Sequence, residues 1–264
     1  MRILIVSDLH HRRNWYRWLA LQKADLTVIA GDLLDGFDIK GIAPQMLYID
    51  DWCRSFTGPL ALCSGNHDAN GIEVSDPDAV ARLPLATQDQ IARIIRHEHW
   101  MDALARPGVV TDRRSEVLKT PSGEIVVTTT PYSFLPEPDK ETLGLWREGA
   151  LLRKKRKIPW IVLHHDPPGN SSVGGIYGDT NLFYRICESL PDFLVSGHQH
   201  EQPYHGSFAE KIASTWCFNP GHPDLRCAAK SSIPNHIILN LIEKTASWYA
   251  SSQGGTIRET ISIA

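Results

Sequence analysis

Short apolar runs alternate with longer segments of helical periodicity along most of the chain. Seven of the runs are rich in Val, Ile and Leu and predict strands, namely Arg2–Val6, Leu26–Ala30, Leu60–Cys63, Ile125–Thr129, Trp160–Leu163, Phe193–Val195 and His236–Ile242. Most of them lack alternation with polar residues, which is typical of strands covered on both faces of a sheet. The last thirty residues carry no helical pattern, and we expect Trp248–Ser251 and Thr256–Ile263 to form an antiparallel edge or hairpin.

Five segments between these runs have apolar residues at helical spacing. The first carries Trp15, Trp18, Leu19 and Gln22 on one face, and the others are Met46–Phe56, Thr87–Leu104, Glu141–Leu152 and Asn181–Leu190. Alternation of strands and helices predicts an α/β fold. Because no repeat, low-complexity linker or clear boundary interrupts the pattern, we expect a single domain over residues 1–264.

Composition and charge narrow the class of protein. Of the 264 residues, 42% are hydrophobic and 22% charged, and the formal net charge is −3. These values are typical of a soluble globular protein and lack the basic excess that nucleic acids or anionic membranes attract. The most basic run, Arg153–Lys157, fits a solvated helix C-terminus, with a nucleic-acid patch as the alternative.

The cysteines and the N-terminus bear on the compartment. The five cysteines are an odd number without a C-x-x-C pair, so we expect buried free thiols in a reducing compartment. The apolar run Ile3–Val6 is too short for a signal peptide, and no stretch reaches the roughly 18 apolar residues of a membrane span. We therefore expect a cytoplasmic protein with no membrane partner.

Polar side chains directly follow five of the predicted strands. They are Asp8 and His10 after the first strand, Asp32 after the second, Asn66, His67 and Asp68 after the third, His164, His165 and Asp166 after the fifth, and His198 and His200 after the sixth. In an open α/β sheet, ligands bind outside the carboxyl ends of the strands. Asp, Asn and His bind divalent metals through oxygen and imidazole nitrogen. Each motif is weak alone, but five in order predict a metal site.

These motifs, as they stand in the chain, are SDLH, AGDLLD, SGNHD, LHHDPPG and SGHQH. Together they resemble the calcineurin-like metallophosphoesterases, and the resemblance runs from Ile3 to about Gly221. The segment Asn219–His222 reads NPGH and looks like the family's common NPGS, with His222 in place of Ser. The resemblance implies a four-layer sandwich of two mixed β-sheets flanked by helices, two divalent metal ions and phosphoester hydrolysis.

The resemblance also implies a ligand set for each metal ion. The first ion would be held by Asp8, His10, Asp32 and His200, and the second by Asp32, Asn66, His165 and His198. Asp32 would bridge the ions through both carboxylate oxygens. His165 is favoured over His164, because the HDPP segment places it where relatives have the ligand.

The same resemblance gives the SGNHD turn two catalytic residues. His67 would not bind metal but would stabilise the phosphate charge and protonate the leaving oxygen. Asp68 would orient the imidazole and keep it cationic, or, as an equal alternative, cap the turn. The nucleophile would be a hydroxide that bridges the two ions, because metals lower the pKa of bound water towards roughly 7.

A charge count gives a preference among phosphate esters. The charges of two divalent ions, the carboxylates of Asp8 and Asp32 and a hydroxide sum to one net positive charge. A phosphodiester, with one negative charge, neutralises this sum, whereas a monoester, with two, leaves a net negative charge. We therefore expect a small phosphodiester or related ester as substrate, with Mn as the first candidate metal and Fe or Zn as the others. A phosphomonoesterase, a nuclease and a non-catalytic scaffold are the alternatives. Substrate choice is expected in the loops of residues 70–112, 132–145 and 169–180, and the oligomeric state is not indicated.

Overall fold

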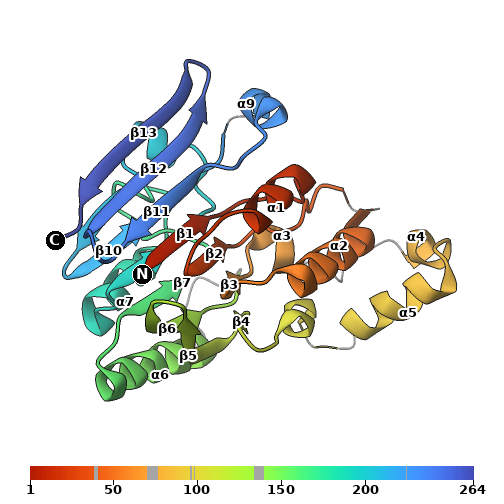
Figure 1. Ribbon diagram of the computed structural model, residues 1–264, viewed down its shortest axis with the longest axis horizontal. Coiled ribbons are helices and arrows are strands. Elements are labelled where there is room, and N and C mark those ends of the chain that lie inside the picture. Colours follow the sequence, from red (N-terminus) through yellow and green to blue (C-terminus); the bar gives the residue numbers. More distant parts are fainter. Residues whose placement is uncertain (39–40, 70–76, 96, 98, 134–139, 224) are drawn as a thin grey trace.

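A computed structural model describes residues 1–38, 41–69, 77–95, 97, 99–133, 140–223 and 225–264 of the chain (Figure 1). Its first sheet has seven strands in the order β13-β12-β11-β1-β2-β3-β4. Their bounds are β1 Arg2–Val6, β2 Leu26–Ala30, β3 Leu60–Cys63, β4 Val109–Val110, β11 His236–Asn240, β12 Thr245–Ser252 and β13 Gly255–Ser262. The run from β1 to β4 is parallel, and β11 to β13 add an antiparallel edge.

The second sheet has six strands in the order β5-β6-β7-β8-β10-β9. Their bounds are β5 Arg114–Thr120, β6 Gly123–Thr129, β7 Trp160–Leu163, β8 Phe193–Val195, β9 Ala209–Ile212 and β10 Thr215–Phe218. The central strands β6, β7, β8 and β10 are parallel, and β5 and β9 are antiparallel edges. Both sheets are therefore mixed, as expected.

Helices form the outer layers and parts of the connections between strands. They are α1 Arg13–Ala20, α2 Ile42–Ser55, α3 Asn66–Ala69, α4 Pro77–Ala81, α5 Leu85–Ile94, α6 Lys140–Arg156, α7 Thr180–Ser189, α8 Gln202–His205 and α9 Leu225–Lys230, with a 3₁₀ helix at Trp100–Leu104. Figure 1 shows α1 and α2 along β1–β3 and α6 along β5 and β6, while α4 and α5 extend at the right of the view. In the described part of the chain, no helix has the length and apolar composition that a membrane crossing needs.

Alternate residues of each central strand face two different cores. In β1, Ile3 and Ile5 pack into the core between the sheets, whereas Leu4 and Val6 pack under α1 and α2. In the second sheet, the outward residues of β6, β7 and β8 pack against α6 and α7. Both faces of each strand are thus apolar, which explains the continuous hydrophobic runs. The predicted four-layer sandwich is confirmed.

Two sequence expectations are wrong in part. The predicted helix Thr87–Leu104 is two elements, because α5 ends at Ile94 and the 3₁₀ helix begins at Trp100, with residues 96 and 98 outside the described ones. All five cysteines are free, but only Cys53, Cys63 and Cys217 are buried; Cys187 is exposed and Cys227 half-buried. The basic run Arg153–Lys157 does lie at the C-terminal end of α6, where the cations complement the helix dipole.

Candidate metal centre

The backbone after the strands turns sharply and directs polar side chains inward. The φ angles of Asp8, His10, Asp32 and His198 are 54°, 42°, 53° and 60°, in the left-handed region that L-residues rarely adopt. Asp and His tolerate this region better than β-branched residues do. Such strained backbone is concentrated at functional sites, where the surrounding structure holds it in place.

Hydrogen bonds join the two sheets at this edge. The backbone N–H of His198, which follows β8 in the second sheet, donates to Asp8 Oδ1 in the first sheet at 3.1 Å. The ring of His165, which follows β7, reaches the carbonyl of Ala30 at the end of β2 at 2.8 Å. The carboxyl ends of the parallel strands in both sheets therefore meet, and their side chains form one site.

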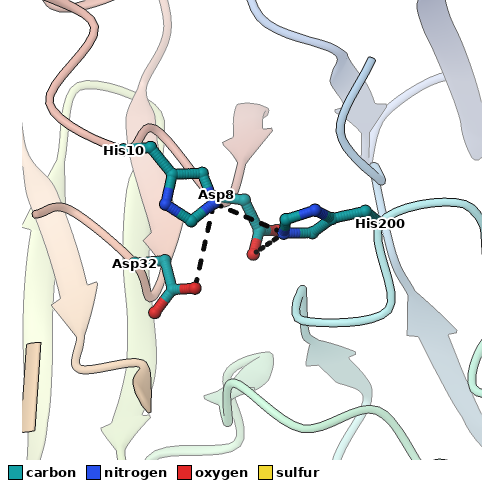
Figure 2. Close-up of side chains that lie close together, drawn as sticks. All are labelled: Asp8, His10, Asp32 and His200. Carbon is teal, nitrogen blue, oxygen red and sulfur yellow. Dashed lines mark hydrogen bonds and ion pairs between the residues drawn. The ribbon is translucent and has the colours of Figure 1, made fainter. Parts of the chain in front are cut away.

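Four of the predicted ligands form a compact first group, which consists of Asp8, His10, Asp32 and His200 (Figure 2). One ligand atom from each lies within 4.8 Å of the others. His10 Nε2 and His200 Nε2 are 3.4 Å apart, and His200 Nε2 is 3.1 Å from Asp8 Oδ1. Imidazole nitrogens and carboxylate oxygens that converge on one point suit a divalent cation.

The other predicted ligands converge on the amide oxygen of Asn66 and form a second group of Asp32, Asn66, His165 and His198. Asn66 Oδ1 lies 2.9 Å from His198 Nδ1 and 3.2 Å from His165 Nε2. His165 Nε2 also lies 3.4 Å from Asp32 Oδ2. Asp32 therefore belongs to both groups, so the structure brings all seven predicted ligands together.

His164 and His165 face different surroundings. His165 is buried, with Nδ1 hydrogen-bonded to Ala30 O, so Nε2 is the ring nitrogen that faces the second group. His164 Nδ1 instead lies 2.7 Å from Thr130 Oγ1, and its Nε2 is 3.9 Å from Asp179. A second ring nitrogen fixed by a carbonyl is the usual arrangement of a metal-binding histidine. The geometry thus favours His165 as the ligand, in agreement with the HDPP motif.

The two carboxylate oxygens of Asp32 have different neighbours. Asp32 Oδ1 accepts the backbone N–H of His67 at 2.9 Å, because the turn into α3 passes directly over it. Only Oδ2 lies between the groups, 3.4 Å from His165 Nε2 and 3.9 Å from His10 Nε2. Oδ2 is thus the oxygen that both groups approach, and the bridge through both oxygens stays a prediction.

The electrostatics of the centre fit a cation. Burial works against the charge of Asp8, yet His200, His165 and His10 hold its pKa well below the ordinary value. Burial likewise opposes charge on His165, but Asp32 and Asp8 raise its pKa to about 10. Asp8 Oδ2 is buried and has no hydrogen-bond partner among the described residues. Since buried polar atoms are normally satisfied, this oxygen suits a metal ligand.

His67 lies beside the first group without joining it. Its Nδ1 accepts the backbone N–H of Gly36 at 2.8 Å, and its Nε2 is 3.9 Å from Asp32 Oδ2. Because Nδ1 is an acceptor, the proton is on Nε2, which faces the centre. The hydrogen bond from Gly36 therefore orients the ring, and the expectation of a cationic imidazole stays a prediction.

Asp68 follows the turn-capping alternative. Its carboxylate accepts three backbone N–H groups, from Leu33 at 3.1 Å, Leu34 at 2.9 Å and Gly65 at 2.9 Å. Burial and then Asp32 raise its pKa to about 7, against these hydrogen bonds. The expected hydrogen bond between Asp68 and His67 is replaced by the one from Gly36 to His67, because the Asp68 side chain points towards Leu33 in the loop after β2. Asp68 fixes the turn that carries Asn66 and His67.

Two further residues lie at the centre: Asp166, which the sequence placed at a strand end without a role, and Tyr132, which was not predicted. Asp166 Oδ1 lies 3.6 Å from His198 Nε2, whereas Asn66 approaches the other ring nitrogen, Nδ1. The half-buried ring of Tyr132 lies 5.8 Å from the ring of His165, and burial, with Asp166 and Asp32, raises its pKa to about 12. Tyr132 follows the predicted strand β6, so the strand-end rule could have identified it as well.

His11 and His222 pack against residues around the centre. His11 packs edge-on against Tyr48, with ring centres 5.3 Å apart, and the ring centre of the buried His222 is 4.8 Å from that of His200.

Parts of the loops expected to select substrate, residues 70–76 and 134–139, lie outside the described residues. The third loop, 169–180, is held by backbone hydrogen bonds such as Gly169 N–H to Asp179 O at 2.8 Å.

Solved structures include chains similar to this one. TT1561 of Thermus thermophilus is 14% identical, with a TM-score of 0.52 over 100% of this chain and 99% of that chain, and it shares the fold. The NAD nucleotidase NadN of Haemophilus influenzae is 12% identical, with a TM-score of 0.47 over 99% of this chain and 49% of that chain. The calcineurin-like phosphoesterase YfkN of Bacillus subtilis is 14% identical, with a TM-score of 0.44 over 100% and 90%. No curated protein matches the sequence.

The sequence model of one family, described as calcineurin-like phosphoesterase, matches residues 1–202, most of the chain. That range contains every one of the five strand-end motifs. The two mixed sheets agree with the fold that the resemblance implies. The chain therefore belongs to the calcineurin-like phosphoesterase family.

Proposed function

We propose that the protein hydrolyses a small phosphodiester, or a related phosphate ester, at a centre of two divalent metal ions. The observation that carries the proposal is that the two groups of ligand-type side chains share Asp32 Oδ2. Mn is the first candidate metal, and Fe or Zn are the others. Two such ions would supply a nucleophile from water at neutral pH and neutralise phosphate oxygens.

The residues of this chain have separate tasks in the proposed reaction. Asp8, His10, Asp32 and His200 hold one ion, and Asp32, Asn66, His165 and His198 hold the other. His67 donates from Nε2–H to an oxygen of the phosphate, stabilising the charge and assisting the leaving oxygen. The Gly36 N–H keeps the ring in the tautomer that this task needs.

The charges around the site favour a diester over a monoester. Among the described residues, Asp8 and Asp32 form ion pairs with histidines only. Asp166 adds a further carboxylate next to His198. A doubly charged phosphate therefore meets more repulsion here than a singly charged one. A phosphomonoesterase is the alternative that the experiment below distinguishes.

The proposed substrate is small. A nuclease binds several phosphates beyond the scissile one and needs a basic groove for them, whereas the chain carries a net charge of −3. Inhibition by a polyanion such as heparin, with a steep dependence on salt, would point to a nuclease instead.

The test compares bis-p-nitrophenyl phosphate with p-nitrophenyl phosphate after metal removal and after Mn is restored. We expect Mn-dependent turnover that favours the diester. His67→Ala should lower kcat by about 10²–10⁴-fold while the amount of bound Mn stays unchanged. His205→Ala, at the exposed end of α8, is the control and should keep full activity.

Two results would count against the proposal. A preference for the monoester would replace the diesterase assignment with a phosphatase. Absence of turnover on either ester, with two Mn ions bound per chain, would favour a scaffold that keeps the fold and the ions without catalysis.

A further inference from the structure

His222 lies against the first ligand group but is not one of its members. The residue is 4% exposed, and its ring centre is 4.8 Å from the ring centre of His200 and 5.3 Å from that of His10. Trp15 packs on it from α1 at 5.3 Å. The imidazole of His222 is thus enclosed between an apolar side chain and two rings of the proposed metal centre.

One nitrogen of this ring is unsatisfied. His222 Nε2 is buried and has no hydrogen-bond partner among the described residues. Buried polar atoms nearly always have a partner, and an unpaired one destabilises the folded state. An apolar side chain of similar size would avoid this cost if His222 served packing alone.

His200 is the ligand that most needs support. Its side chain is 37% exposed, compared with 14% for His10 and 2% for Asp32. The ring of His222 is tilted by 32° from the ring of His200, and the ring centres are 4.8 Å apart, so the two rings are in direct contact. This contact limits rotation of the most exposed ring in the first group.

The backbone fixes His222 in this position. Its N–H donates to His200 O at 3.0 Å, and Asn219 Nδ2 donates to Gln199 O at 3.2 Å. Asn219 Oδ1 accepts the N–H of Gly221 at 2.9 Å. Gly221 has a φ of 64°, which favours glycine. The segment 219–222 is therefore joined to the loop that carries His200.

We propose that His222 is a positioning residue of the first metal group, which orients His200 and whose Nε2 gains its hydrogen-bond partner when the centre binds metal. The inference rests on the proposed two-metal function. Supporting residues of this kind commonly change metal affinity by about 10–100-fold when they are replaced. His222 thus makes the first group bind its ion more tightly.

The test measures metal affinity and stability rather than turnover. In the stripped protein, Mn binding is titrated by calorimetry for the native chain, His222→Leu and His222→Gln, with His205→Leu as the control. We expect His222→Leu to weaken the first site about 10-fold or more, and His222→Gln, whose amide nitrogen reaches the position of Nε2, to recover part of that loss. The second site should be unchanged.

The thermal midpoint of the metal-free protein distinguishes positioning from packing. Because Leu removes an unpaired buried nitrogen, the midpoint of metal-free His222→Leu should equal or exceed the native one. Native affinity in His222→Leu would overturn the inference. Equal weakening in His222→Leu and His222→Gln, with a lower metal-free midpoint in both, would also overturn it and assign His222 to packing. If the native chain binds no Mn, the two-metal function fails together with the inference.

Discussion

At the scale of single residues, the centre depends on side chains that use one polar atom for a hydrogen bond to a backbone group. His165 Nδ1 is held by Ala30 O, Asp32 Oδ1 by the N–H of His67, and His67 Nδ1 by the N–H of Gly36. In each case the remaining atom faces the centre. The residue types were predictable from the motifs, but these partners were not, because they come from backbone groups of neighbouring loops.

Asp112 gives a pH-dependent prediction that is independent of catalysis. The residue is buried, its Oδ1 accepts the N–H of Ser64 at 2.7 Å, and burial raises its pKa to about 7. At pH values between about 3.9, the pKa of Asp in an unfolded chain, and about 7, Asp112 is protonated in the folded protein but ionised in the unfolded one. The stability from this group is complete below pH 4 and is lost as the pH rises through 7.

Asp112→Asn should remove this loss. We expect the difference in unfolding free energy, variant minus native, to increase by about 3 kcal/mol from pH 4 to pH 8. Urea unfolding of the metal-free protein measures this difference. The exposed Asp51→Asn is the control and should follow the native curve. Parallel curves for Asp112→Asn and the native chain would contradict the assigned pKa.

At the scale of elements, the turn between β3 and α3 carries much of the centre. Gly65 allows this turn, because a Cβ there would lie 2.5 Å from the Asp32 backbone nitrogen and 2.8 Å from His165 Cε1. Asp68 then holds the turn by accepting three backbone N–H groups. The sequence predicted Asn66 and His67 at this turn but left the role of Asp68 open, since capping and orienting residues have the same spacing.

Gly65→Ala should therefore disrupt the metal centre. The added methyl group must displace Asp32 or His165, so we expect Mn affinity to fall by about 10-fold or more and stability by about 1–3 kcal/mol. Gly144→Ala is the matched control, because its Cβ meets nothing within 4 Å. Calorimetry and thermal unfolding of both variants check the prediction, and native Mn affinity in Gly65→Ala would refute it.

At the scale of the whole molecule, the two sheets and their helices form the four layers that the motif order implied. Continuous apolar runs identified the central strands, because both of their faces are covered. The edge strand β5, Arg114–Thr120, was not predicted, because charged residues at its exposed positions interrupt the apolar run. The edge strand β9 was missed because the charged residues Glu210 and Lys211 separate its two buried ends. The strand β10 was missed although three of its four residues are buried. Sequence patterns thus located the core better than the edges.

Because the centre joins both sheets, metal binding should stabilise the entire fold. Ions that bind only the folded state raise its stability by mass action, so saturating Mn should raise the thermal midpoint by about 5–10 °C. Asp32→Asn, which alters the shared ligand, should remove most of this shift, whereas His205→Asn should keep it. Calorimetric scans with and without Mn make the comparison, and an equal shift in Asp32→Asn would contradict a shared ligand.

The most direct test of the two-metal centre is anomalous diffraction from crystals of the Mn-loaded protein. We expect two Mn peaks about 3.5–4 Å apart, with Asp32 Oδ2 between them. Asp8, His10 and His200 should surround one peak, and Asn66, His165 and His198 the other. A single peak, or two peaks that do not share Asp32, would contradict a two-metal centre bridged by Asp32.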